Sequence, residues 1–140
     1  MKILGIEHIG IAVKNLKDSI EFYESVFGLK CYTIEDVIDQ KVRTAFFKVG
    51  DIKVELLESI SSDGPISSFI EKRGEGLHHI AYKVTDVNAS LTELKGRGVK
   101  LIDKYERIGA EGLAIAFINP KSTFGALTEL CSSNNKINEI

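Results

Sequence analysis

The chain has 140 residues, of which 44% are hydrophobic and 27% charged, and its formal net charge is −2. These values are typical of one soluble globular domain and give no reason to expect nucleic acid or a membrane surface as a partner. The apolar opening segment contains Glu7 and His8, so it does not read as a signal peptide or a membrane span. The simplest expectation is a cytoplasmic enzyme, with Cys31 and Cys131 as reduced thiols.

The first half of the chain begins with alternating apolar and polar residues, which predict a strand over residues 6–13. Asn15 is a suitable N-cap for a helix that Gly28 ends. The segments that follow are predicted as three strands, with a tight turn at Gly50-Asp51, and then a short helix; they cover residues 30–37, 41–49, 52–59 and 66–72.

The second half repeats the first with an offset of 79 − 8 = 71 residues, because the segment from His79 to Val84 matches the one from His8 to Val13. Its predicted elements are a strand, a helix and three strands, over residues 77–84, 87–97, 100–107, 113–118 and 125–131. Each half therefore has the order βαβββ.

The predicted fold class is α+β, with two tandem βαβββ modules that form a curved mixed sheet around a metal-containing cleft. A half of about seventy residues with one amphipathic helix is too small to be stable alone, so we expect the halves to close against each other. The chain is predicted as a single domain over residues 1–140. Its parts are module one, a linker helix, module two and a polar tail, at about 5–60, 65–73, 77–131 and 132–140.

The alternation of side chains along the strands selects four candidate site residues. If Ile9 and Ile11 pack under the first helix, His8 faces the other way, and the same parity selects His79 rather than His78 in the second half. Glu55 and Glu129 lie in otherwise apolar strands at matching places near the ends of the two modules.

A single histidine or glutamate of this kind is usually a packed or solvated residue. The recurrence of both types in both halves instead favours a metal site. Imidazole nitrogens with carboxylate oxygens are typical ligands of a divalent transition metal. The sequence therefore predicts one divalent ion held by His8, His79, Glu129 and Glu55.

The duplicated βαβββ pattern with paired His and Glu resembles the vicinal oxygen chelate superfamily, which includes glyoxalase I and extradiol dioxygenases, and within it the methylmalonyl-CoA epimerases. The resemblance extends from Gly5 to Leu130. The segments that carry it are HIGIAVK, EFYESVFGL, GPISSFIEKRGEGLHHIAYK and IGAEGLAIAFINPKSTFGALTELC.

The resemblance implies that His8, His79 and Glu129 are metal ligands, and that Glu55, where some members carry Gln, is a fourth ligand or lies beside the metal. The chain departs from the family at two positions. Asn119 stands where members often have His, and Thr44 stands where some have a Glu that is proposed as a base.

The implied activity is epimerisation of methylmalonyl-CoA through a metal-stabilised enolate, with Glu129 and Glu55 as the catalytic carboxylates. The implied cofactor is one divalent ion (Co, Mn, Ni or Zn), the implied partner is an acyl-CoA thioester, and a homodimer is expected. Two alternatives stay open: a lactoylglutathione lyase of the glyoxalase I type and a non-catalytic small-molecule-binding protein of the same fold. The sequence around Asn119 favours the epimerase over the lyase, since glyoxalases usually have a DPDGY-like turn there.

Overall fold

The structure is a computed structural model that describes residues 1–133. The chain forms two compact units: one is His8–His78, and the other combines Met1–Glu7 with the described residues from His79 onward. The predicted polar tail, 132–140, lies for the most part outside the described residues. Within residues 1–133, no helix is long and apolar enough to cross a membrane.

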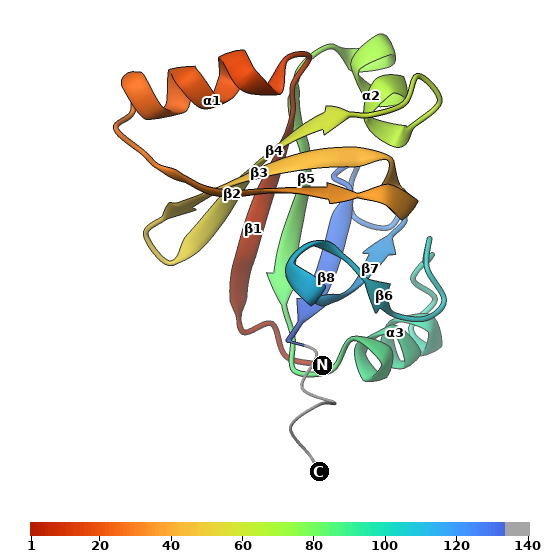
Figure 1. Cartoon of the computed structure of the whole chain (residues 1–140). Helices are drawn as coiled ribbons and strands as arrows, with labels where there is room; N and C mark the ends of the chain where they lie inside the picture. The colour runs from red at the N-terminus through yellow and green to blue at the C-terminus, as the bar shows by residue number, and fades with distance from the viewer. Residues whose placement is uncertain (134–140) are drawn as a thin grey trace. The chain divides into compact units, whose positions relative to one another are not determined.

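The unit His8–His78 contains a four-stranded mixed sheet in the order β2-β3-β4-β1. β1 and β4 are parallel, whereas β3 is antiparallel to both β2 and β4. β1 takes its first three residues from the other unit. The elements of this unit are β1 (Gly5–Ala12), α1 (Leu16–Ser25), β2 (Cys31–Val37), a 3-10 turn (Ile38–Gln40), β3 (Val42–Val49), β4 (Ile52–Ser59) and α2 (Pro65–Arg73). Figure 1 shows the chain leaving β4 towards α2.

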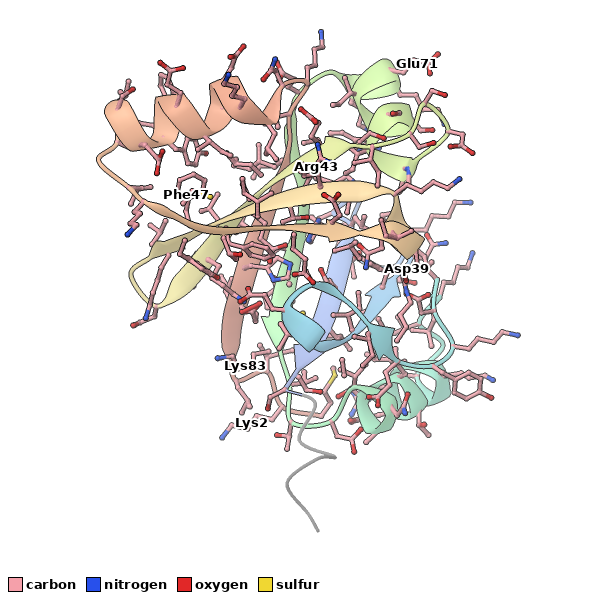
Figure 2. All side chains as sticks on the ribbon, viewed as in Figure 1. Lys2, Asp39, Arg43, Phe47, Glu71 and Lys83 are labelled. Atoms are coloured by element: carbon pink, nitrogen blue, oxygen red, sulfur yellow. The ribbon has the colours of Figure 1, made fainter. Side chains whose placement is uncertain are left out.

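The helix α1 forms where the sequence predicts it. The Asn15 side chain accepts a hydrogen bond from the Asp18 backbone N–H at 3.0 Å, which satisfies one free donor of the first turn. The apolar side of the helix then packs on the sheet, and the ring centroids of Tyr23 and Phe47 lie 5.2 Å apart. Phe47 points from its strand towards α1 (Figure 2). Gly28, with φ of 69°, lets the chain turn back after the helix.

The second unit has the same arrangement, with its four strands in the order β5-β8-β7-β6. β5 and β8 are parallel, and β7 is antiparallel to both β8 and β6. The elements are β5 (Gly76–Lys83), α3 (Val87–Gly96), β6 (Arg107–Ile108), a 3-10 turn (Ala110–Gly112), β7 (Ala114–Ile118) and β8 (Thr128–Ser132). β5 takes its first three residues from the other unit.

The core of this unit follows the predicted parity. Asp86 caps α3 by accepting a hydrogen bond from the Ala89 N–H at 2.9 Å. Tyr82 and Val84 pack under the helix against the cluster that contains Leu91. His79 is therefore on the opposite face of β5, away from α3, as the sequence predicts.

The prediction of a strand over 100–107 is wrong. Only Arg107–Ile108 form a strand there, and Leu101 makes an isolated bridge to Ile118. The backbone N–H groups of Ile102 and Asp103 both donate to the Phe117 carbonyl, so the segment turns at this point instead of extending a ladder. The Asp103 side chain in turn accepts from the Phe117 N–H at 2.8 Å. A carboxylate thus replaces the backbone partner that a strand would provide.

The predicted fold class is confirmed in its main point: the protein is α+β and built from two tandem βαβββ modules. The linker helix is α2, over Pro65–Arg73. The single domain and the cleft between the modules stay predictions.

Candidate metal-binding residues

In the unit His8–His78, a buried histidine lies beside a buried glutamate. The Nδ1 atom of His8 is 3.1 Å from the Glu55 Oε2 atom, and each residue is 4% exposed. The two side chains come from the parallel neighbours β1 and β4 and point away from the face that packs on α1. Phe46, fully buried, pairs with Glu55 across the antiparallel β3–β4 ladder.

The second unit contains the equivalent pair. The Nε2 atom of His79 is 3.1 Å from the Glu129 Oε2 atom, and their side chains are 6% and 5% exposed. These residues lie on the parallel neighbours β5 and β8. Phe117 pairs with Glu129 across the β7–β8 ladder and presents its edge to the His79 ring, with 5.8 Å between the centroids.

The two pairs occupy the same register positions in their sheets. Glu55 pairs with Gly10, two residues after His8. Glu129 pairs with Ala81, two residues after His79. The sequence predicts all four as site residues, and the structure places them as one His–Glu pair in each unit. Their role in binding a metal ion stays a prediction.

Each pair fits the donor set of a divalent transition metal. A nearly buried imidazole nitrogen lies beside a nearly buried carboxylate oxygen, surrounded by aromatic and aliphatic residues. Such groups are costly to bury unless they are paired or coordinate a metal. Nitrogen and oxygen ligands in this combination suit Zn, Co, Ni or Mn.

The neighbouring histidine has a different environment. The His78 ring contacts the ring of Phe69 in α2 edge-on, with 5.0 Å between the centroids. This packing fits the structural role that strand parity assigns to His78, and it separates this residue from the His79–Glu129 pair.

Two residues near the pairs were not assigned a role from the sequence. Cys131 places its Sγ atom 3.4 Å from the Glu129 Oε1 atom, inside the protein. Phe117 packs on His79 as described above. Strand alternation gave a signal for Cys131, since it lies two residues after Glu129 and so shares its face. Thr44, which departs from the family pattern, is buried on β3 opposite Leu57.

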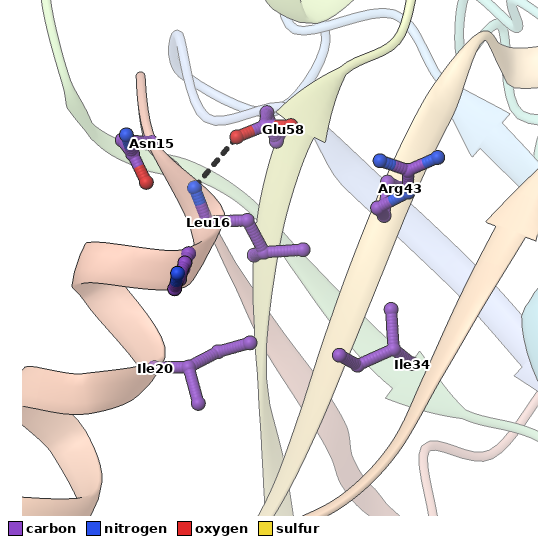
Figure 3. Close-up of a pocket in the computed structure, with 7 residues that line it drawn as sticks. Asn15, Leu16, Ile20, Ile34, Arg43 and Glu58 are labelled. Carbon is purple, nitrogen blue, oxygen red and sulfur yellow. Dashed lines mark hydrogen bonds between the residues drawn. The ribbon is translucent and has the colours of Figure 1, made fainter.

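A pocket of about 270 Å³ lies on the other face of the first sheet, between α1 and β2. Leu16 and Ile20 of α1 face Ile34 of β2 across it (Figure 3). At its rim the Glu58 carboxylate accepts a hydrogen bond from the Leu16 N–H at 2.6 Å. The pocket contains none of the predicted site residues. His8 and Glu55 point from the opposite face of this sheet, whereas His79 and Glu129 lie on strands of the other unit.

Comparison with known proteins places the chain in a family. Residues 7–117 match the model of the glyoxalase/bleomycin resistance protein/dioxygenase superfamily. The chain belongs to this superfamily, which confirms the resemblance seen in its sequence.

Within the superfamily the similarity to epimerases is also confirmed. The chain is 34% identical to the ethylmalonyl-CoA/methylmalonyl-CoA epimerase of Cereibacter sphaeroides, over 89% of this chain and 95% of the relative. A solved structure of methylmalonyl-CoA epimerase in complex with methylmalonyl-CoA and NH4+ matches with a TM-score of 0.92 and 34% identity, covering 95% and 96% of the two chains. The Bacillus subtilis protein YqjC is 48% identical over 90% of both chains.

Proposed function

We propose that this protein is a metal-dependent methylmalonyl-CoA epimerase. The observation that carries the proposal is the buried His–Glu pair that recurs in both units at the same register, with 3.1 Å between nitrogen and oxygen each time. Relatives and structural neighbours that are named epimerases support an epimerase-type enzyme with an acyl-CoA substrate.

We propose that one divalent ion is held by His8, His79 and Glu129, with Glu55 as a fourth ligand or a neighbour of the ion. The donor types and their duplication support this arrangement. A bound divalent ion supplies positive charge that stabilises the enolate of the thioester. Sequence and donor chemistry leave the choice among Co, Mn, Ni and Zn to measurement.

Epimerisation inverts the α-carbon of methylmalonyl-CoA without any net change in atoms. One carboxylate takes the α-proton, and the C–H electron pair moves into the enolate. A proton is then delivered to the opposite face of the same carbon. We assign these roles to Glu129 and Glu55, because each is nearly buried beside a histidine that holds its orientation. The low polarity around them strengthens their interaction with the developing charge.

The assay that separates the candidate activities offers two substrates to the metal-loaded protein. We expect one enantiomer of methylmalonyl-CoA to be converted to the racemate, and the hemithioacetal of methylglyoxal and glutathione to be unchanged. Turnover of the hemithioacetal alone would establish a lyase instead. An enzymatic role would be contradicted if the protein showed neither activity and bound neither the metal nor the thioester tightly.

A pair of neighbouring substitutions tests the metal assignment. His79→Asn removes a proposed ligand, so we expect a loss of Co²⁺ affinity of at least about 100-fold. The matched control, His78→Asn, alters the contact with Phe69 and should leave Co²⁺ affinity unchanged. Calorimetric titration of both variants measures the difference. Equal affinities in the two variants would show that His79 does not bind the ion.

The base assignment has its own test. Glu55→Gln keeps the size of the side chain but removes its ability to take a proton, so racemisation should fall by about 100-fold or more. If racemisation were unchanged while the metal content held, the base role of Glu55 would be wrong. We also propose that the protein is a homodimer. Light scattering of the purified chain should give the mass of two chains, and the mass of one chain would contradict this.

A further inference from the structure

The two oxygen atoms of Glu129 have different neighbours. Oε2 lies 3.1 Å from the Nε2 atom of His79, whereas Oε1 lies 3.4 Å from the Sγ atom of Cys131. Cys131 is 1% exposed, so its thiol cannot exchange this contact for bulk water. The carboxylate is therefore held from both sides.

The thiol is the donor in this contact, because an ionised carboxylate can only accept. A thiol is a weak donor in water. Here it is packed in an apolar cluster with Ala81 and Ile115, and hydrogen bonds are electrostatically stronger in such surroundings. The bond also fixes the rotation of the carboxyl group, because it engages one oxygen while the imidazole engages the other.

The other unit has no equivalent of this thiol. Leu57 lies two residues after Glu55, as Cys131 lies two residues after Glu129, and an aliphatic side chain cannot donate a hydrogen bond. The duplicated site is thus asymmetric in chemistry although it is symmetric in register.

We propose that Cys131 is a positioning residue, whose S–H group holds Glu129 Oε1 and leaves Oε2 directed at the ligand position beside His79. This inference rests on the proposed function and extends it. It gives a reason why Glu129 acts as a fixed ligand. The role is orientation only: Cys131 neither binds the ion nor touches the substrate.

The hydrogen bond can be tested in the metal-free full-length protein. The infrared S–H stretch lies apart from other protein bands, and the band lost in Cys131→Ser identifies this thiol. In Glu129→Leu, which removes the acceptor, we expect the Cys131 band to shift to higher wavenumber. The Cys31 thiol, which donates to the Thr33 carbonyl at 3.3 Å, should keep its band and serves as the internal control. An unchanged Cys131 band would overturn the proposal.

The consequence for metal binding is measured by Co²⁺ titration. Cys131→Ala removes the donor, and the loss of a group that orients a ligand lowers metal affinity about 10-fold. Cys131→Ser retains a donor and should stay within about threefold of the wild type. The matched control is Cys31→Ala. This thiol is distant from Cys131 in the sequence and donates to a backbone carbonyl, so its loss should not change the affinity for Co²⁺.

The outcomes separate this inference from the proposed function. If the wild type binds Co²⁺ and the alanine variant binds equally well, or if serine fails to recover the affinity lost with alanine, the positioning role is wrong. An intense sulfur-to-cobalt charge-transfer band that disappears in Cys131→Ser would also overturn it, because the thiol would then be a ligand. If the wild type binds no metal but the infrared shift occurs, the proposed function fails while the orientation of Glu129 by Cys131 stands.

Discussion

The carboxylate of Asp103 replaces a backbone partner in the second sheet, and its removal should destabilise the protein measurably. One oxygen accepts a hydrogen bond from the Phe117 N–H at 2.8 Å, and the other lies 3.4 Å from the Nε atom of Arg107. The Asp103 side chain is 19% exposed, so water replaces it poorly. Asp103→Ala should therefore disrupt the attachment of the 100–107 segment.

The magnitude follows from the two contacts. A buried backbone N–H left without its acceptor costs about 1–3 kcal/mol, and the weaker contact with Arg107 adds less than about 1 kcal/mol. We expect Asp103→Ala to lower the free energy of unfolding by about 2 kcal/mol. For a chain of this length the melting temperature should fall by roughly 5 to 10 °C.

The matched variant is Asp103→Asn, whose side-chain carbonyl can still accept from the Phe117 N–H. It should cost less than about 1 kcal/mol, because only the charge is lost. Urea denaturation of the three proteins at neutral pH gives both differences. The reasoning would be refuted if alanine changed stability by less than about 0.5 kcal/mol, the usual size of a neutral surface substitution, or if both variants were equally destabilised.

Two smaller predictions concern the first unit. Glu58→Ala leaves the Leu16 N–H at the start of α1 without its acceptor and should lower stability by about 1 kcal/mol in urea denaturation, with Glu58→Gln closer to wild type; equal losses would argue against the hydrogen bond. Hydrogen bonds from Lys41 and then Ser61 lower the pKa of Asp63 from 3.8 to about 2, so its stabilising effect is present above pH 3.8 and is lost as the pH falls towards 2. The melting temperature of Asp63→Asn should accordingly lie below that of the wild type at pH 6, with the gap closing towards pH 2; a gap independent of pH would contradict this.

Much of the fold could be predicted because its signals are local. Asn15 and Asp86 cap the helices that follow them, and both caps depend on residues within three positions of the cap. The alternation along β1 and β5 placed His8 and His79 on one face without knowledge of their partners. The internal repeat selected one histidine and one glutamate in each half, but their placement on neighbouring parallel strands came from the structure.

The predictions that failed or were not made depend on contacts between distant segments. The segment 100–107 has apolar residues suited to a strand, but a single side chain, Asp103, takes over the pairing with β7. The contact between Cys131 and Glu129 was within reach of strand parity. Its chemical meaning became visible only once the distances to both oxygens of the carboxylate were known.

The central claim is that the duplicated His–Glu pairs serve to exchange the α-proton of an acyl thioester with the help of a divalent ion. The most direct measurement is incorporation of deuterium at the α-carbon of methylmalonyl-CoA in D₂O, followed by proton NMR. The account predicts fast incorporation with the metal-loaded wild type, loss of it after chelation, and recovery when Co²⁺ is returned. Incorporation that survived both chelation and the His79→Asn substitution would contradict it.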